Sequence, residues 1–217
     1  MSTAFIYPVF ALDSDKATEA VKDGSLVVPE RVPDTEVARG NWMASEAAKY
    51  DQFHRLVSIT VNSEMYGCVY KKEPEIDLLR WLWHHLNGIR ASAMGKLYAG
   101  GWRSDLFWPR LLNMSIKHGL PIHNWAKNNP FKRYQTFELL EISNIYACGA
   151  HPIVRPLPPL HLALKYWLGD TFMSEDELLR RASLNELDES LETETCRITQ
   201  AMHDVLLKFR ISPEENI

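Results

Sequence analysis

Residues 5–12 read FIYPVFAL and run directly into Asp13-Ser14-Asp15. An almost wholly apolar run that ends in acids predicts a buried β-strand with carboxylates at its exit. Pro8 argues against a central place in a sheet, because proline cannot donate a ladder hydrogen bond. If the strand continues through the acids, Asp13 and Asp15 point to the same side and can share a divalent cation.

The rest of the chain alternates between strand and helix patterns. Residues 16–54 indicate a long surface connection with a short helix at 41–50. Beyond it we expect a hairpin of strands 55–62 and 65–70, a helix over 75–87 that stops at Asn87-Gly88, a strand over 93–99 and a helix from 104 to about 117. The remainder predicts helices near 136–147, 159–168, 174–182 and 190–209. This order predicts a single α/β domain over residues 1–217, with a mixed sheet flanked by helices and a helical C-terminal half.

Composition limits the function classes without choosing one. The net charge of −4 gives no general attraction to nucleic acid, yet a metal-dependent nuclease supplies positive charge through its ions. No apolar run is long enough to span a bilayer, and the first residues do not resemble a secretory signal. The three cysteines, Cys68, Cys148 and Cys196, show no metal-binding spacing. We therefore expect a cytoplasmic protein with reduced thiols and no membrane partner.

Further acids stand at the ends of predicted elements. Asp105 opens a helix after Gly100-Gly101, and Glu194 lies beside the apolar stripe of the last helix, turned toward the body of the protein. Taken alone, an Asp at a helix start is most often an N-cap, and a Glu beside a stripe is most often solvated. The order and the flanking sequence of the acids carry more information than each acid alone.

Five segments set this order: Val28–Asp34 (VPERVPD), Arg55–Val61 (RLVSITV), Gly100–Leu106 (GGWRSDL), Lys117–Pro121 (KHGLP) and Leu157–Gly169. With the acidic pair after the first strand, they resemble the DEDD superfamily of DnaQ-like 3′–5′ exonucleases, especially stand-alone relatives of the family B DNA polymerase proofreading domain. The resemblance covers roughly residues 5–209. It implies a ribonuclease H-like fold.

The resemblance also implies a two-metal site. In such a site Asp13, Asp15, Asp105 and Glu194 would hold two Mg²⁺ or Mn²⁺ ions and act as the catalytic residues. Trp102 and Arg103 would contact the terminal nucleotides of a single-stranded 3′ end by stacking and phosphate pairing.

The chain departs from the family at several positions. Asp15 stands where the family has Glu, Thr195 stands where it has its fourth Asp, and Leu191 occupies its tyrosine position. Glu194 is the nearest substitute for the missing fourth ligand, and Glu138 is a more remote one. An alternative register places Ala11 and Asp13 on the two acids of the first motif, which would leave only one acid.

Two functions follow from this pattern. One is a metal-dependent 3′–5′ exonuclease, impaired or not by its divergent motifs. The alternative is an inactive exonuclease-fold module that binds nucleic acid or docks onto a polymerase, helicase or effector complex. A third class, an enzyme using histidine, receives little support, because the adjacent His84 and His85 point about 100° apart on a helix and His151 and His161 lack a partner motif. DNA and RNA remain equal candidates as ligand.

Overall fold

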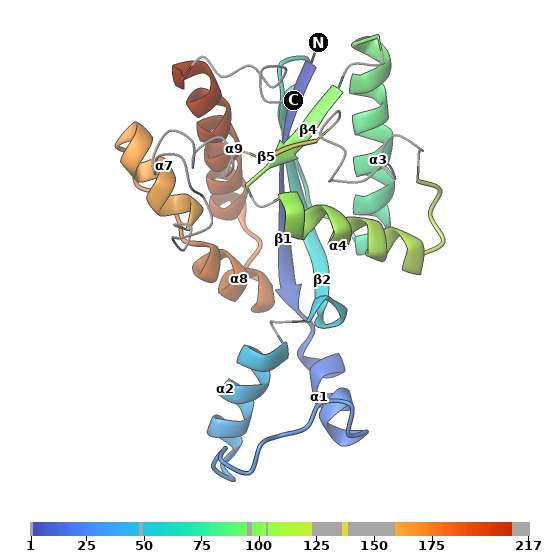
Figure 1. Ribbon diagram of the computed structural model, residues 1–217, viewed down its shortest axis with the longest axis vertical. Helices are drawn as coiled ribbons and strands as arrows, with labels where there is room; N and C mark the ends of the chain where they lie inside the picture. The colour runs from blue at the N-terminus through green and yellow to red at the C-terminus, as the bar shows by residue number, and fades with distance from the viewer. Residues whose placement is uncertain are drawn as a thin grey trace, which may run out of the picture.

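The computed structural model describes residues 2–47, 50–94, 97–102, 104–122, 136–138 and 159–209. In these residues a mixed sheet runs in the order β3-β2-β1-β4-β5 (Figure 1). Its strands are β1 (Ser2–Leu12), β2 (His54–Ser63), β3 (Gly67–Lys71), β4 (Leu97–Gly101) and β5 (Thr136–Glu138). The first three strands pair antiparallel, whereas β4 is parallel to β1 and β5 is parallel to β4.

Helices cover both faces of the sheet. On one side lie α3 (Glu75–Ser92) and α4 (Ser104–Lys117), and on the other lie α7 (Leu160–Leu168), α8 (Glu175–Ser183) and α9 (Glu189–Phe209) (Figure 1). Beyond the far end of β1 are α1 (Ser14–Lys22), α2 (Glu36–Ala47) and the short 3-10 helix η1 (Asp51–Phe53). The predicted α/β class, the mixed sheet flanked by helices and the helices of residues 159–209 are confirmed.

The central strand β1 divides the core by alternation. Ala4 and Ile6 pack into the cluster formed with α3 and α4, whereas Phe5 packs into the cluster formed with α7 and α9. Pairing with β4 stops at Phe5, so from Ile6 onward one side of β1 has no strand partner among the described residues. Pro8 is therefore tolerated in a central strand, because its missing N–H interrupts no ladder on that side.

Three expectations about local structure were wrong. The segment after β1 forms the helix α1 and not a surface connection. Its buried face consists of only Ala17 and Ala20, which is too little to give a recognisable helical pattern in a polar stretch of sequence. Helix α3 continues through Asn87-Gly88, because Ile89 extends its buried face and this burial outweighs the weak stop signal. The expected helix at 136–147 begins instead as strand β5, and its remaining residues lie outside the described ranges.

The geometry assumed for the first acidic pair was also wrong. Strand β1 ends at Leu12, Asp13 is the N-cap of α1, and Asp15 lies in the first turn of that helix. The two carboxylates consequently do not share one side of a strand. No helix in the described part of the chain is both long enough and apolar enough to cross a membrane.

Candidate nucleic-acid interface

The junction between β4 and α4 is pressed against the middle of β1. A Cβ atom added to Gly101 would lie 2.7 Å from the backbone oxygen of Ile6, closer than real Cβ contacts allow. Glycine is therefore required where the end of β4 passes the β1 backbone. This contact places the start of α4 beside Ile6 and the residues that follow it on β1.

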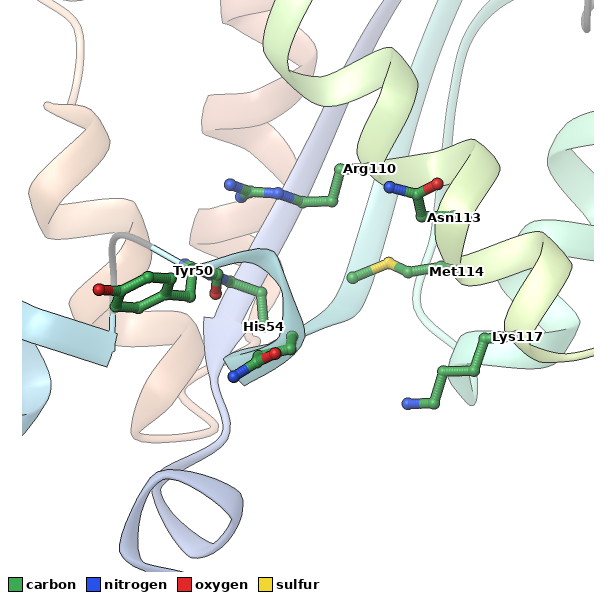
Figure 2. Close-up of a pocket in the computed structure, with 7 residues that line it drawn as sticks. Tyr50, His54, Arg110, Asn113, Met114 and Lys117 are labelled. Atoms are coloured by element: carbon green, nitrogen blue, oxygen red, sulfur yellow. The ribbon is translucent and has the colours of Figure 1, made fainter. Parts of the chain in front are cut away.

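Helix α4 then runs along a groove made of two adjoining pockets that share His54 and Arg110. The first pocket, of about 540 Å³, is shown in Figure 2. Its lining comes from α4 and from the segment that leads into β2: Tyr50, Gln52, His54, Arg110, Asn113, Met114 and Lys117. None of these described lining side chains is acidic. We call this pocket the basic end of the α4 groove.

The second pocket, of about 310 Å³, lies between β1, α4 and α8. Besides the two shared residues, its lining comprises Tyr7, Pro8, Val9, Phe10, Trp102, Phe107, Glu175, Asp176, Leu178 and Leu179. Aromatic rings dominate it, and its acids come from α8 alone. We call it the aromatic end of the α4 groove.

Phe10 connects the two ends. The guanidinium carbon of Arg110 lies 4.8 Å from the centre of the Phe10 ring, a distance typical of a cation–π contact. The His54 ring meets Phe10 edge-on at 6.4 Å, and its Nδ1 lies 3.0 Å from the carbonyl oxygen of Tyr50. Arg110 is thus held where the two pockets adjoin, so a ligand in either pocket would lie next to it.

Burial and two carboxylates shape the aromatic end. Burial raises the pKa of the Tyr7 phenol well above its usual range, and the nearby charges of Glu175 and Glu194 raise it further. Tyr7 is therefore a neutral phenol. Glu175 accepts a hydrogen bond from the Leu160 amide at 2.7 Å and pairs with His161 Nδ1 at 2.8 Å. Its carboxylate thus contributes to anchoring the start of α7.

Glu194 is buried, as the sequence predicted, with 8% of its surface exposed. One carboxylate oxygen accepts a hydrogen bond from the Met173 amide at 2.6 Å, and the other pairs with Arg197 at 2.6 Å. Both oxygens therefore have protein partners. In this arrangement Glu194 connects α9 to the segment before α8.

Asp13 also has protein partners. Its carboxylate caps α1 by accepting from the Lys16 amide at 3.1 Å and pairs with the Lys16 ammonium at 2.5 Å. Partial burial acts to raise the pKa of Asp13, but the Lys16 hydrogen bonds and the charges of Lys16 and Arg55 hold it below its usual range. Asp15 is exposed in the first turn of α1.

Asp13 is separated along β1 from the start of α4. Asp13 is seven residue steps beyond Ile6, where β1 meets the β4–α4 junction, and seven steps span about 23 Å of extended strand. Asp105 is in the first turn of α4, and its side chain lies outside the described residues. Asp13 therefore lies far along β1 from the β4–α4 junction, and whether Asp105 belongs to a metal site stays a prediction.

Trp102 and Arg103 are the residues predicted to contact the terminal nucleotides. Trp102 is 8% exposed and packs edge-on against Trp167, with ring centres 6.2 Å apart, while also lining the aromatic end of the groove. Arg103 lies outside the described residues. Within those residues, no three His, Cys, Asp or Glu side chains gather closely enough to hold a metal ion. The described carboxylates do not fit a shared Mg²⁺ or Mn²⁺ site as placed, and that site stays a prediction.

The basic end of the α4 groove was not predicted from the sequence. Arg110, Asn113 and Lys117 recur at i, i+3 and i+7 on α4, on a face that also carries Met114. Attention to the polar stripe of this helix, and not only to its apolar stripe, would have found them. No local signal joins them to His54, since that contact depends on the tertiary fold.

The strand order, the mixed pairing and the helices on both faces define a ribonuclease H-like α/β fold, as predicted. The chain is similar to the structure of the family B DNA polymerase from the hyperthermophilic archaeon Pyrobaculum calidifontis, with a TM-score of 0.53 and 11% sequence identity over 96% of this chain. The match spans 25% of the polymerase chain. At this identity the likeness shows the fold alone. No protein-family model matches the sequence, and no curated protein matches it.

Proposed function

We propose that this chain is a nucleic-acid-binding module on a ribonuclease H-like fold, which holds single-stranded DNA or RNA along the α4 groove without cleaving it. The observation that carries the proposal is the basic end of the groove. There Arg110 and Lys117 line a pocket with His54, and none of its described lining side chains is acidic. Such a pocket suits a phosphodiester backbone.

Electrostatics explains why binding must be local. A chain of net charge −4 has no overall attraction to a polyanion, so affinity has to come from cations concentrated at one place. Arg110 and Lys117 lie seven residues apart on one helix, about 10 Å along its axis. Neighbouring phosphates of an extended single strand lie roughly 6–7 Å apart, so the two cations could reach different phosphates.

The aromatic end supplies the second element of single-strand recognition. Proteins that bind single strands without sequence preference combine a basic track with rings on which bases stack. Phe10 is partly exposed at the junction of the two pockets, with Arg110 over one face. A base placed here would contact Phe10 and the neutral phenol of Tyr7 while its phosphate meets Arg110.

The placement of the acids favours binding over cleavage. Asp13 caps a helix about 23 Å along β1 from the β4–α4 junction, and Glu194 is engaged by a backbone amide and an arginine. The side chains that β1 presents to the aromatic end include Tyr7 and Val9, which are two residues apart and carry no carboxylate.

The 3′–5′ exonuclease is the second candidate. Its specific support is Asp105, which begins α4 directly after β4, beside the central strand. If this activity exists, its metal ligands must include carboxylates other than Asp13 and Glu194, which are both engaged by protein groups. The role of a docking module on a polymerase, helicase or effector complex is compatible with either candidate, since the similar polymerase carries this fold as one part of a longer chain.

The binding half of the proposal is tested by fluorescence anisotropy with labelled 12-nucleotide DNA and RNA strands at several salt concentrations. Arg110→Gln and Lys117→Gln should each weaken binding about 5- to 10-fold at low salt. Each should also lower the slope of log affinity against log salt by about 0.7, the value for one lost phosphate contact on a single strand. Lys165→Gln, an exposed lysine on α7, is the matched control. Equal binding by all three variants would refute the proposed interface.

The catalytic question needs a separate assay. The protein is incubated with 3′- and 5′-labelled strands in Mg²⁺ and then in Mn²⁺, with Asp105→Ala as the control for a contaminating nuclease. Strands that stay intact while still binding support the proposed module. Shortening from the 3′ end that Asp105→Ala abolishes would establish the exonuclease instead.

A further inference from the structure

Two cysteines that are distant in the sequence meet where β3 crosses α9. Cys68 is exposed on β3, an edge strand of the described sheet, and Cys196 is partly buried on α9. Both line the same surface pocket, of about 690 Å³. The Cys68 sulfur lies 3.6 Å from the Thr199 hydroxyl, which donates to the carbonyl oxygen of Cys196 at 2.9 Å.

We propose that Cys68 and Cys196 form an oxidation site, at which a small disulfide converts the two thiols into a bond that ties β3 to α9. The site is separate from the α4 groove and does not depend on the function proposed above. It makes the attachment of the C-terminal helix to the sheet responsive to redox conditions.

The surrounding contacts hold the two thiols in register. Cys68 pairs with Asn62 in the β2–β3 ladder, and the Asn62 side chain donates to Gln200 on α9 at 3.0 Å. Thr60, two residues earlier on β2, donates to Thr195 at 2.9 Å, and both of these threonines are fully buried. These two hydrogen bonds fix α9 to the hairpin on both sides of Cys196, so β3 and α9 are held together where the two cysteines lie.

The two thiols have different environments. Burial raises the pKa of Cys196 to about 12, and its hydrogen bond with Cys68 and the charge of Glu192 contribute to the rise. Cys68 is the more exposed sulfur and meets the oxidant first. Glu189 and Glu192 also line the pocket, so an uncharged oxidant such as 2-hydroxyethyl disulfide is preferred over an anionic one.

The reaction consists of two exchanges. The Cys68 thiolate attacks one sulfur of the oxidant, breaking its S–S bond, forming a mixed disulfide and releasing one 2-mercaptoethanol. Cys196 then loses its proton and attacks the Cys68 sulfur, releasing a second 2-mercaptoethanol. The protein loses two protons and two electrons, and the oxidant gains both as it becomes two molecules of 2-mercaptoethanol.

Mass spectrometry tests the bond directly. The full chain is treated with 2-hydroxyethyl disulfide at pH 8, alkylated and digested with trypsin, which cuts after Arg55, Lys71, Arg181 and Arg197. The expected product is peptide 56–71 joined to peptide 182–197, lighter by two hydrogens than their sum and separated by reductant. Cys148→Ser should leave this product unchanged, whereas Cys68→Ser and Cys196→Ser should each abolish it.

Thermal unfolding supplies an independent readout. A bridge that closes so long a loop restricts the unfolded chain, so the oxidised protein should melt roughly 10 °C higher than the reduced protein. The Cys148→Ser variant should show the same shift, and either single variant of the pair should show none. Recovery of Cys68 only as a mixed disulfide, or alkylation of both thiols after oxidant treatment, would overturn the proposal.

Discussion

Replacing Gly101 by alanine tests the contact that positions the start of α4. The added Cβ would lie 2.7 Å from the Ile6 carbonyl oxygen, and because that neighbour is backbone, relief requires β4 or β1 to shift. Forced overpacking of this kind costs about 1–3 kcal/mol. For a chain of this size a loss of about 2 kcal/mol lowers the melting temperature by roughly 4–8 °C.

The matched control is Gly88→Ala. Gly88 lies inside α3, and a Cβ added there meets no atom within 4 Å. Alanine is the better helix former by up to about 1 kcal/mol, so this substitution should be neutral or stabilising. Both variants are compared with the parent chain by urea unfolding and by thermal melting followed by circular dichroism. If Gly101→Ala is as stable as the parent chain, the close approach of β4 to Ile6 is not what fixes the junction.

Three further predictions concern separate features. Asp13→Asn should keep the α1 cap but lose the Lys16 ion pair, costing about 0.5 kcal/mol at pH 7 because solvent screens the pair. The pKa of Asp13 is lower in the folded protein than its ordinary value of 3.8. The difference in unfolding free energy between the parent chain and Asp13→Asn is therefore present above pH 3.8 and fades as the pH falls below it. Urea unfolding between pH 7 and pH 2 measures this difference. Thr195→Val should cost about 1–3 kcal/mol by leaving the buried Thr60 hydroxyl without an acceptor, and a double-mutant cycle with Thr60→Val should show coupling of about 1 kcal/mol. If binding in the α4 groove uses side-chain cations, affinity measured at constant ionic strength should be the same in EDTA as in Mg²⁺, whereas a metal-bridged complex would dissociate in EDTA.

The architecture was largely readable from the sequence. The apolar run 5–12, the hairpin alternation and the helix over 104–117 appear as β1, the β2–β3 pair and α4. Glu194 was expected to turn inward from the spacing of its stripe, and it is buried. These features depend on periodicity, which persists in the fold because each element buries one face.

The acidic pair shows where such reasoning fails. Asp-Ser-Asp after an apolar strand has the appearance of metal ligands, yet Asp followed by a helical segment is equally the signature of an N-cap. The local sequence does not say whether the strand ends before or after Asp13. That depends on where β1 stops pairing with β2, at Leu12 opposite His54, which is a tertiary property.

The groove could not have been assembled from the sequence for a related reason. Its lining comes from β1, the segment before β2, the α4 helix and α8, which are brought together only by the crossing of α4 over the sheet. Each residue alone is ordinary: a surface lysine, a partly exposed phenylalanine, a histidine at the start of a strand. They form the proposed ligand site only because the fold brings them close together.

The same geometry is compatible with the proposed binding role, because the described part of β1 presents no carboxylate to the α4 groove. A carboxylate pair able to meet an acid from the start of α4 would have to occupy β1 positions two apart beside the β4–α4 junction, and Tyr7 and Val9 stand at such positions. Carboxylates there would repel a phosphate backbone unless divalent cations neutralised them. A neutral phenol and an aliphatic side chain add no such repulsion from β1, which is compatible with the proposed attraction of phosphate by Arg110 and Lys117. In the proposed module, binding without cleavage would follow from the same two side chains.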